Sequence, residues 1–142
     1  MKKLLYNHRW KLIFAGLLLV ISLWTLWGNT APETSLYEIT SPRIPASFDG
    51  FRIAHISDFH NTELGENHSR VMKLLREGSP DIIVITGDLI DSRRTDVETA
   101  LSFVRLAAEL APVYYVPGNH ESRVSEYRDL KQGLLAQHNT RK

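Results

Sequence analysis

Cysteine is absent from the 142-residue sequence. Its absence excludes disulfide bonds and metal sites built on thiolates. It does not decide the compartment, because proteins of the cytosol and of the cell exterior both occur without cysteine. With 43% hydrophobic and 23% charged residues, the composition is otherwise that of a globular protein with one modest domain.

Acidic residues are missing from the first 30 positions, which carry Lys2, Lys3, Arg9 and Lys11 and therefore a charge of +4. Residues 31–142 hold 13 basic and 16 acidic side chains, which gives a charge of −3. An excess of acid over base argues against a polyanion-binding surface, so we expect no nucleic-acid partner for this part of the chain.

Long apolar runs are also missing, with one exception that follows the basic head of residues 1–11. Residues 12–27 are apolar except for three small or polar positions, although a membrane span usually needs about 20 apolar residues. Because the positive charges precede the run, we expect a single-pass anchor that leaves the rest of the chain outside the cytoplasm. A cleaved signal peptide is the alternative, since it shares the basic head and the apolar centre. Residues 28–47 contain three prolines and are expected to form a linker.

Residues 48–142 alternate between short β-type runs and helical patterns. Strands are expected over residues 51–57, 81–86 and 113–116, and helices over about 67–77, 96–110 and 123–137. The second helix is expected to begin with a capping box formed by Thr95 and Glu98. The order β-α-β-α-β-α predicts right-handed crossovers and a parallel sheet. No glycine-rich phosphate loop follows the first strand, which argues against a nucleotide-binding domain.

Each expected strand is followed by a cluster of polar residues. The clusters are Ser57, Asp58 and His60 after the first strand, Gly87, Asp88 and Asp91 after the second, and Gly118, Asn119, His120 and Glu121 after the third. Because the carboxyl ends of parallel strands meet at one edge of a sheet, we expect these side chains along one rim. Of the other histidines, we interpret His55 as packed within its strand and His68 as solvated.

Several carboxylates on one rim repel one another unless protons or cations lie between them. Mixed oxygen and imidazole donors suit Mn, Fe, Zn or Co. A carboxylate can also bridge two metal ions about 3.5–4 Å apart, an arrangement that hydrolyses phosphate esters. Asp88 is central in sequence order and is the candidate bridge. Each cluster alone is a weak signal, because Asp-x-His and Gly-Asp also occur in plain turns, but three clusters after three successive strands favour a metal site.

In this order and spacing, "SDFH", "GDLID" and "PGNHE" resemble the first three motifs of the calcineurin-like metallophosphoesterases. Phe59 stands where the family usually has leucine. The resemblance implies that Asp58 and His60 bind a first metal ion. It also implies that Asp88 bridges two ions and that Asn119 binds the second.

The resemblance further implies that His120 contacts the phosphate or protonates the leaving oxygen, while Asp91 orients its imidazole. The cofactors would be two divalent ions such as Mn, Fe or Zn, and the substrate a phosphate mono- or diester. The N-terminus is similar to that of the family's bacterial, membrane-anchored subgroup. The resemblance thus implies a single-pass protein of the cell membrane with an extracytoplasmic hydrolase domain.

The resemblance covers about residues 48–137, which is roughly half of a whole domain. The family's later histidines, one isolated and others in a Gly-His-x-His motif, have no counterpart, and His138 gets no role. The expected fold class is α/β: the N-terminal β-α-β-α-β-α half of a four-layer metallophosphoesterase β-sandwich, preceded by a single transmembrane helix. Residues 48–142 would then be a truncated domain with one uncovered, apolar sheet face.

Two functions follow from these expectations. The first is a metal-dependent phosphoesterase, which the three motifs favour. The second is a non-catalytic, membrane-tethered half-domain that binds at most one metal ion weakly, because Asp88 and Asn119 alone would hold the second ion.

Overall fold

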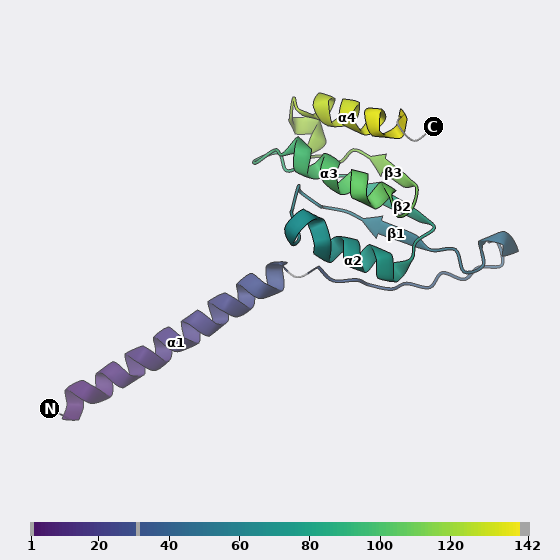
Figure 1. The fold of residues 1–142 in the computed structure, drawn as a ribbon. Coiled ribbons are helices and arrows are strands. Elements are labelled where there is room, and N and C mark those ends of the chain that lie inside the picture. The colour runs from purple at the N-terminus through teal and green to yellow at the C-terminus, as the bar shows by residue number, and fades with distance from the viewer. Residues whose placement is uncertain (1, 31, 140–142) are drawn as a thin grey trace. The chain divides into compact units, whose positions relative to one another are not determined.

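The computed structural model describes residues 2–30 and 32–139 of the chain. Five residues of the chain lie outside this description: Met1 of the predicted head, Ala31 of the predicted linker, and residues 140–142 of the predicted domain. The chain divides into two compact units, Met1–Glu33 and Thr34–Lys142. The second unit contains every strand that the structure describes (Figure 1).

The first unit is a single helix, α1, which spans Lys2–Thr30. At a rise of about 1.5 Å per residue, its apolar residues 12–27 cover roughly 24 Å, which is less than the roughly 30 Å of a bilayer core. In the part of the chain that the structure describes, no helix combines the length and the apolar character that crossing a membrane requires. Residues 12–27 are therefore helical, but the predicted transmembrane span is not supported.

The second unit is built on a three-stranded parallel sheet in the order β1-β2-β3. Strand β1 begins two residues later than predicted, because the Arg52 N–H donates to the Asp81 carboxylate at 2.7 Å and not to a neighbouring strand. The predicted parallel α/β arrangement is confirmed. The strands are β1 (Ile53–Ile56), β2 (Ile82–Thr86) and β3 (Val113–Val116).

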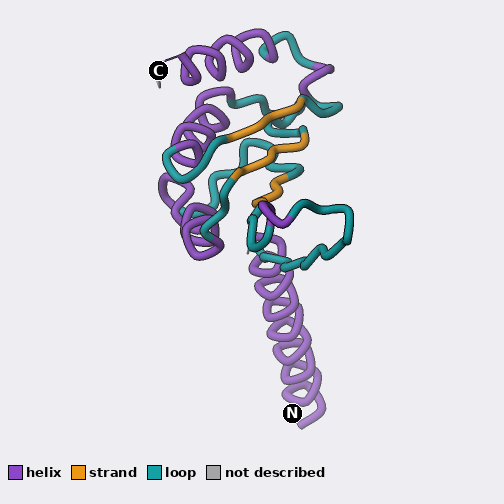
Figure 2. Tube along the Cα trace, turned by 90° about the vertical axis from the view of Figure 1, so that its right-hand side faces the viewer, coloured by secondary structure: helices purple, strands orange, loops and turns teal. Residues whose placement is uncertain are grey.

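One α-helix follows each strand, as predicted, but the third begins four residues later than expected, at Tyr127, because Glu121–Arg123 form a separate 3₁₀ turn. Figures 1 and 2 show α2 and α3 on one face of the sheet and α4 beside α3. The helices are α2 (Ser69–Gly78), α3 (Val97–Ala108) and α4 (Tyr127–Asn139). Single turns of 3₁₀ helix occur at Ala46–Phe48, Glu66–His68 and Glu121–Arg123.

The N-terminus of α3 differs from its prediction. Its cap is Asp96, whose carboxylate accepts from the Thr99 N–H at 3.0 Å and from the Thr99 hydroxyl at 2.8 Å. The Thr95 hydroxyl instead donates to the Asp91 carbonyl at 2.9 Å. The predicted capping box of Thr95 and Glu98 is therefore wrong, because Thr95 belongs to the preceding turn.

The hydrophobic core lies between the sheet and the helices. Ile83 and Ile85 of β2 face this core and are fully buried. On the opposite face of the sheet, Ile53 is 60% exposed, Tyr114 59% and Val116 55%. Parallel sheets are normally covered on both faces. The apolar face that we expected to be uncovered is thus open in the described part of the chain.

Two histidines are placed differently from their interpretation. His55 lies exposed on the open face, where its Nε2 is 2.6 Å from the Thr86 hydroxyl oxygen, so it is not packed. His68 is only 2% exposed, so it is not solvated. Its burial is possible because Nε2 lies 2.8 Å from the Ser102 hydroxyl of α3.

Candidate metal centre

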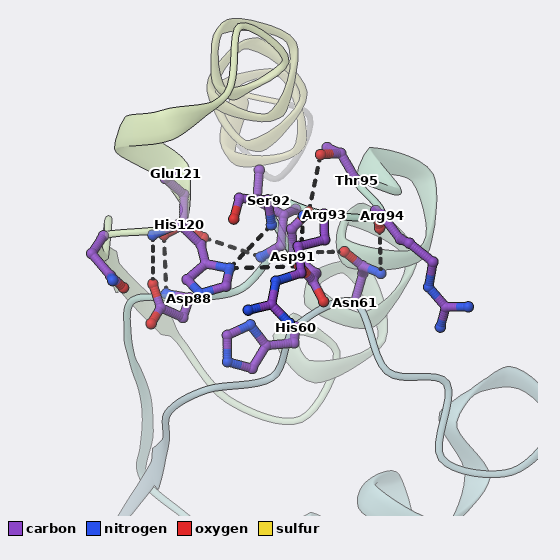
Figure 3. Close-up of polar contacts among 12 residues, drawn as sticks. His60, Asn61, Asp88, Asp91, Ser92, Arg93, Arg94, Thr95, His120 and Glu121 are labelled. Carbon is purple, nitrogen blue, oxygen red and sulfur yellow. Dashed lines mark hydrogen bonds and ion pairs between the residues drawn. The ribbon is translucent and has the colours of Figure 1, made fainter.

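Three loops meet at the carboxyl edge of the sheet, one after each strand. The His60 N–H donates to the Asp88 carbonyl and the Asn61 N–H to the Leu89 carbonyl, each at 2.8 Å. These bonds join the loop after β1 to the loop after β2. Oδ1 of Asp88 accepts from the His120 N–H at 2.9 Å, which joins the second loop to the third (Figure 3). The rim predicted from strand order is therefore held together by hydrogen bonds that backbone N–H groups donate, two to carbonyls and one to the Asp88 carboxylate.

The centre of the rim is a group of three partly buried side chains, His60, Asp88 and His120. One ligand atom from each lies within 4.8 Å of the others. The ring centroids of the two histidines are 4.5 Å apart, and the rings are arranged edge to face. Nδ1 of His60 is buried without a hydrogen-bond partner, which is costly unless a cation or water satisfies it. One carboxylate and two imidazoles are a donor set that fits a divalent ion such as Mn, Fe or Zn.

Asp58 lies at the margin of this group. Its carboxylate accepts from the Ser57 hydroxyl at 2.6 Å and lies 3.8 Å from Nε2 of His60. Asp58 and His60 have φ angles of 55° and 50°, in the left-handed region. Non-glycine residues adopt this conformation only when their surroundings hold them in it. The Asp-x-His pair is thus a strained turn that presents two side chains next to each other.

Glycine allows the second and third loops to approach closely. Gly87 has a φ of 87°, and a Cβ atom there would lie 2.6 Å from the Cα of Gly118. The next residue, Asp88, also has a positive φ of 51°. Any side chain at Gly87 would push the loops apart and move Asp88 away from the two histidines.

Glu121 is a residue of this region whose role the sequence did not reveal. It is 1% exposed, and its carboxylate accepts from the N–H groups of Asp88 at 3.0 Å, Ile90 at 3.1 Å and Gly118 at 2.7 Å. One buried carboxylate therefore closes the turns after β2 and β3 together. Burial, and then the charge of Glu121, raises the pKa of Tyr115 far above its usual value.

The proton of His120 is assigned by its neighbours. Its Nδ1 accepts from the Ser92 N–H at 3.0 Å, so a neutral ring carries its proton on Nε2. Oδ1 of Asp91 is 3.7 Å from Nδ1, which is too long for a hydrogen bond. The group that contacts Nδ1 is thus the backbone of Ser92, and the predicted orienting role of Asp91 stays a prediction.

Asp91 is held as a carboxylate close to both histidines. The Arg93 N–H donates to its Oδ1 at 2.7 Å. This hydrogen bond, followed by the nearby His120 and His60, lowers the pKa of Asp91. Negative charge is therefore available beside the imidazoles at neutral pH.

Two asparagines complete the rim in different ways. Asn61 Oδ1 accepts from the Asp91 N–H at 2.6 Å, and its Nδ2 donates to the Arg94 carbonyl at 3.2 Å (Figure 3). Asn61 thereby fixes the loop that carries Asp91, a role that the sequence did not indicate. Asn119, predicted as a ligand, is exposed, and its carbonyl accepts from the Ser122 hydroxyl. The three-residue group consists of two histidines and one carboxylate and does not include Asn119.

The family model of the calcineurin-like phosphoesterases matches residues 51–141. The uncharacterized metallophosphoesterase YkuE of Bacillus subtilis is 42% identical over 65 residues, which is 44% of this chain and 23% of that protein. The uncharacterized metallophosphoesterase Cj0846 of Campylobacter jejuni is 30% identical over 120 residues, which is 82% of this chain and 32% of that protein.

A transmembrane protein with metallophosphoesterase domain from Danio rerio is 29% identical over 92 residues, which is 63% of this chain and 21% of that protein. The matched segment thus spans between about a fifth and a third of these relatives' lengths. No solved structure matches the chain.

Proposed function

Because the chain belongs to the calcineurin-like phosphoesterase family, we propose that it acts as a metal-dependent hydrolase of phosphate mono- or diesters. The convergence of His60, Asp88 and His120 within 4.8 Å carries this proposal. A divalent ion, when bound, supplies Lewis-acid activation of water and of the phosphate. The residues of the chain bind and orient the reactants and move the proton.

The proposed ligands divide between two ions. Asp58 and His60 would hold the first, Asp88 would contribute to both, and Asn119 would hold the second. The proximity of Asp88 to both His60 and His120, with one ligand atom of each residue within 4.8 Å of the others, supports its bridging role. The short distance between Asp58 and His60 supports a shared ion for this pair.

His120 is the proposed proton donor. With Nδ1 accepting from the Ser92 N–H, the neutral ring presents Nε2–H to the substrate. To give this proton to the leaving oxygen, the ring must first take up a second proton at Nδ1 in place of the Ser92 hydrogen bond, so that a neutral imidazole remains after the transfer. The Asp91 carboxylate, 3.7 Å from Nδ1, is the proposed positioning residue of this ring.

The decisive experiment compares the chain with its Asp88→Asn variant. We expect manganese-stimulated hydrolysis of a chromogenic phosphodiester by the parent, and a loss of at least about 100-fold in the variant, because a bridging ligand is removed. Glu126→Gln, an exposed carboxylate away from the rim, is the matched control and should keep the parent rate. Hydrolysis by Asp88→Asn at the parent rate would disprove the assignment.

A non-catalytic metal-binding module is the second candidate. In the described part of the chain one group of three His, Asp or Glu ligands is found, and Asp58 lies outside it, which favours a single site. Titration calorimetry with Mn²⁺ separates the two candidates. Two tight sites support the enzyme, whereas one weak site without hydrolysis supports the module.

We also propose that α1 attaches the domain to the cell membrane, with residues 34–142 outside the cytoplasm. The exposed apolar side chains of α1, such as Phe14 at 63% and Trp24 at 73%, support this, and the fish relative is named a transmembrane protein. Membrane fractionation of the expressed chain, followed by protease accessibility of the second unit in intact cells, tests both parts of the proposal.

A further inference from the structure

His68 is a buried titratable residue that the proposed mechanism does not use. Its ring lies in an aromatic cluster with Phe59 and Phe103. The centroid of His68 is 5.7 Å from that of Phe59 and 5.6 Å from that of Phe103. The two phenyl rings stack at 4.2 Å with an interplanar angle of 18°. His68 therefore packs against the residue that lies between Asp58 and His60 in the sequence.

One hydrogen bond, made by Nε2, orients the His68 ring. The Ser102 hydroxyl donates to the Thr99 carbonyl at 2.9 Å, so the Ser102 oxygen accepts from Nε2–H of His68 at 2.8 Å. The ring is thus tied to α3 through one directional bond. Asn67 and His68 have φ angles of 50° and 58°, so the backbone also adopts the left-handed region to bring the ring inward.

Phe59 connects this cluster to the metal centre. The loop of residues 57–61 contains three left-handed non-glycine residues, Asp58, His60 and Asn61. Phe59 lies between Asp58 and His60 and is the buried residue of this loop, with 6% exposure. A strained turn persists only where packing holds it. The contacts that hold Phe59 inward are therefore contacts that keep Asp58 and His60 directed to the rim.

We propose that His68 is a positioning residue of the metal centre, which acts through Phe59 on the turn that carries Asp58 and His60. The inference rests on the proposed function in that it takes these two residues as metal ligands. The His68 ring is held by its hydrogen bond and therefore keeps Phe59 in one orientation. An aliphatic side chain could fill the same space but has no hydrogen bond to fix its own orientation. His68 thus supports the metal ligands from outside, so its loss should lower metal affinity although no ligand is removed.

The test measures Mn²⁺ affinity of the full chain by calorimetry. His68→Ala should weaken Mn²⁺ binding by about tenfold or more, the scale on which supporting groups act. Ser102→Ala keeps the ring but removes its hydrogen-bond acceptor, and should weaken binding in the same direction by a smaller factor. His68→Gln, which can still donate to Ser102, should recover part of the affinity.

The control is Val104→Ala, a truncation of a residue that is also buried on α3. If Val104→Ala lowers both the melting temperature and the Mn²⁺ affinity as much as His68→Ala does, His68 is only a core residue and the proposal is wrong. Unchanged affinity in both His68→Ala and Ser102→Ala would overturn it as well.

A second readout does not depend on the metal. The backbone amide resonances of Asp58 and His60 in the metal-free chain should shift in Ser102→Ala and stay in place in Val104→Ala. If the parent chain binds no Mn²⁺ while these resonances shift as expected, the proposed function fails and the coupling of His68 to the turn stands. If they do not shift, the coupling itself is disproved.

Discussion

At the scale of single residues, the rim depends on one side chain that carries no proposed chemistry. Glu121 is buried and accepts three backbone hydrogen bonds from the second and third loops. We expect Glu121→Gln to lower the free energy of unfolding by about 2–3 kcal/mol, because the amide group replaces an acceptor with a donor opposite a buried N–H. Urea unfolding measures the change.

The exposed Glu126 provides the comparison for this prediction. Glu126→Gln removes the same charge at the surface and should change the free energy of unfolding by less than about 0.5 kcal/mol. Equal losses in both variants would mean that net charge, and not the buried hydrogen bonds of Glu121, sets the effect.

His68 gives the stability a defined pH dependence. Burial lowers its pKa below the ordinary value, and nearby Glu63 offsets this only in part. The unfolded chain therefore binds a proton more readily than the folded chain. The neutral form stabilises the fold fully above about pH 6.5, and this contribution is lost as the pH falls below that value toward the folded pKa.

Thermal unfolding between pH 8 and pH 5 tests this expectation. The parent melting temperature should fall on acidification, and His68→Leu should reduce the slope, although it lowers stability at every pH. A slope that is unchanged in His68→Leu would assign the pH dependence to other groups.

At the scale of elements, α3 depends on its cap. Asp96→Ala should cost about 1 kcal/mol in unfolding free energy, because two hydrogen bonds to Thr99 are lost. The hydrogen bonds from the Thr99 N–H and then from its hydroxyl lower the pKa of Asp96. The contribution is therefore present above the unfolded pKa of about 4 and lost as the pH falls further. Urea unfolding of Glu98→Gln, which leaves this cap intact, should give a change below about 0.5 kcal/mol.

The sequence predicts the strands and helices well because their apolar periodicity is local. Ile83 and Ile85 belong to a short, continuous apolar run of β-branched residues, and its length and composition are typical of a buried strand in a parallel sheet. The cap of α3 differs from its prediction because Asp96 and Thr95 are both good caps, and the choice depends on the Asp91 carbonyl in the preceding turn.

The site is predictable only in part, because many of its contacts join residues that are distant in the sequence. Strand order alone brings His60, Asp88 and His120 to one rim. The roles of Glu121 and His68 depend on partners about 30 residues away, since Glu121 binds the N–H groups of the loop after β2 and His68 binds Ser102. No periodic pattern records such contacts.

At the scale of the whole molecule, the open sheet face governs solution behaviour. Ile53, Tyr114 and Val116 are each more than half exposed, and contiguous apolar surface promotes association. We expect the double variant Ile53→Thr, Val116→Thr to bind less of a hydrophobic fluorescent dye than the parent, at an unchanged circular dichroism spectrum. Because α1 is identical in both proteins, a difference in dye binding reports the open sheet face. Equal dye binding by the two proteins would contradict the exposure of this face.

The register of the sheet also sets the order of events during folding. Ile53 pairs with Ile82, and Ile83 with Val113, so each pairing must close a crossover of about 30 residues, which is slow compared with local helix formation. His60, Asp88 and His120 each follow a different strand, so they come together only when both pairings are complete. A cation held by all three would therefore slow unfolding and leave the folding rate unchanged. Metal retention would then govern the lifetime of the native state.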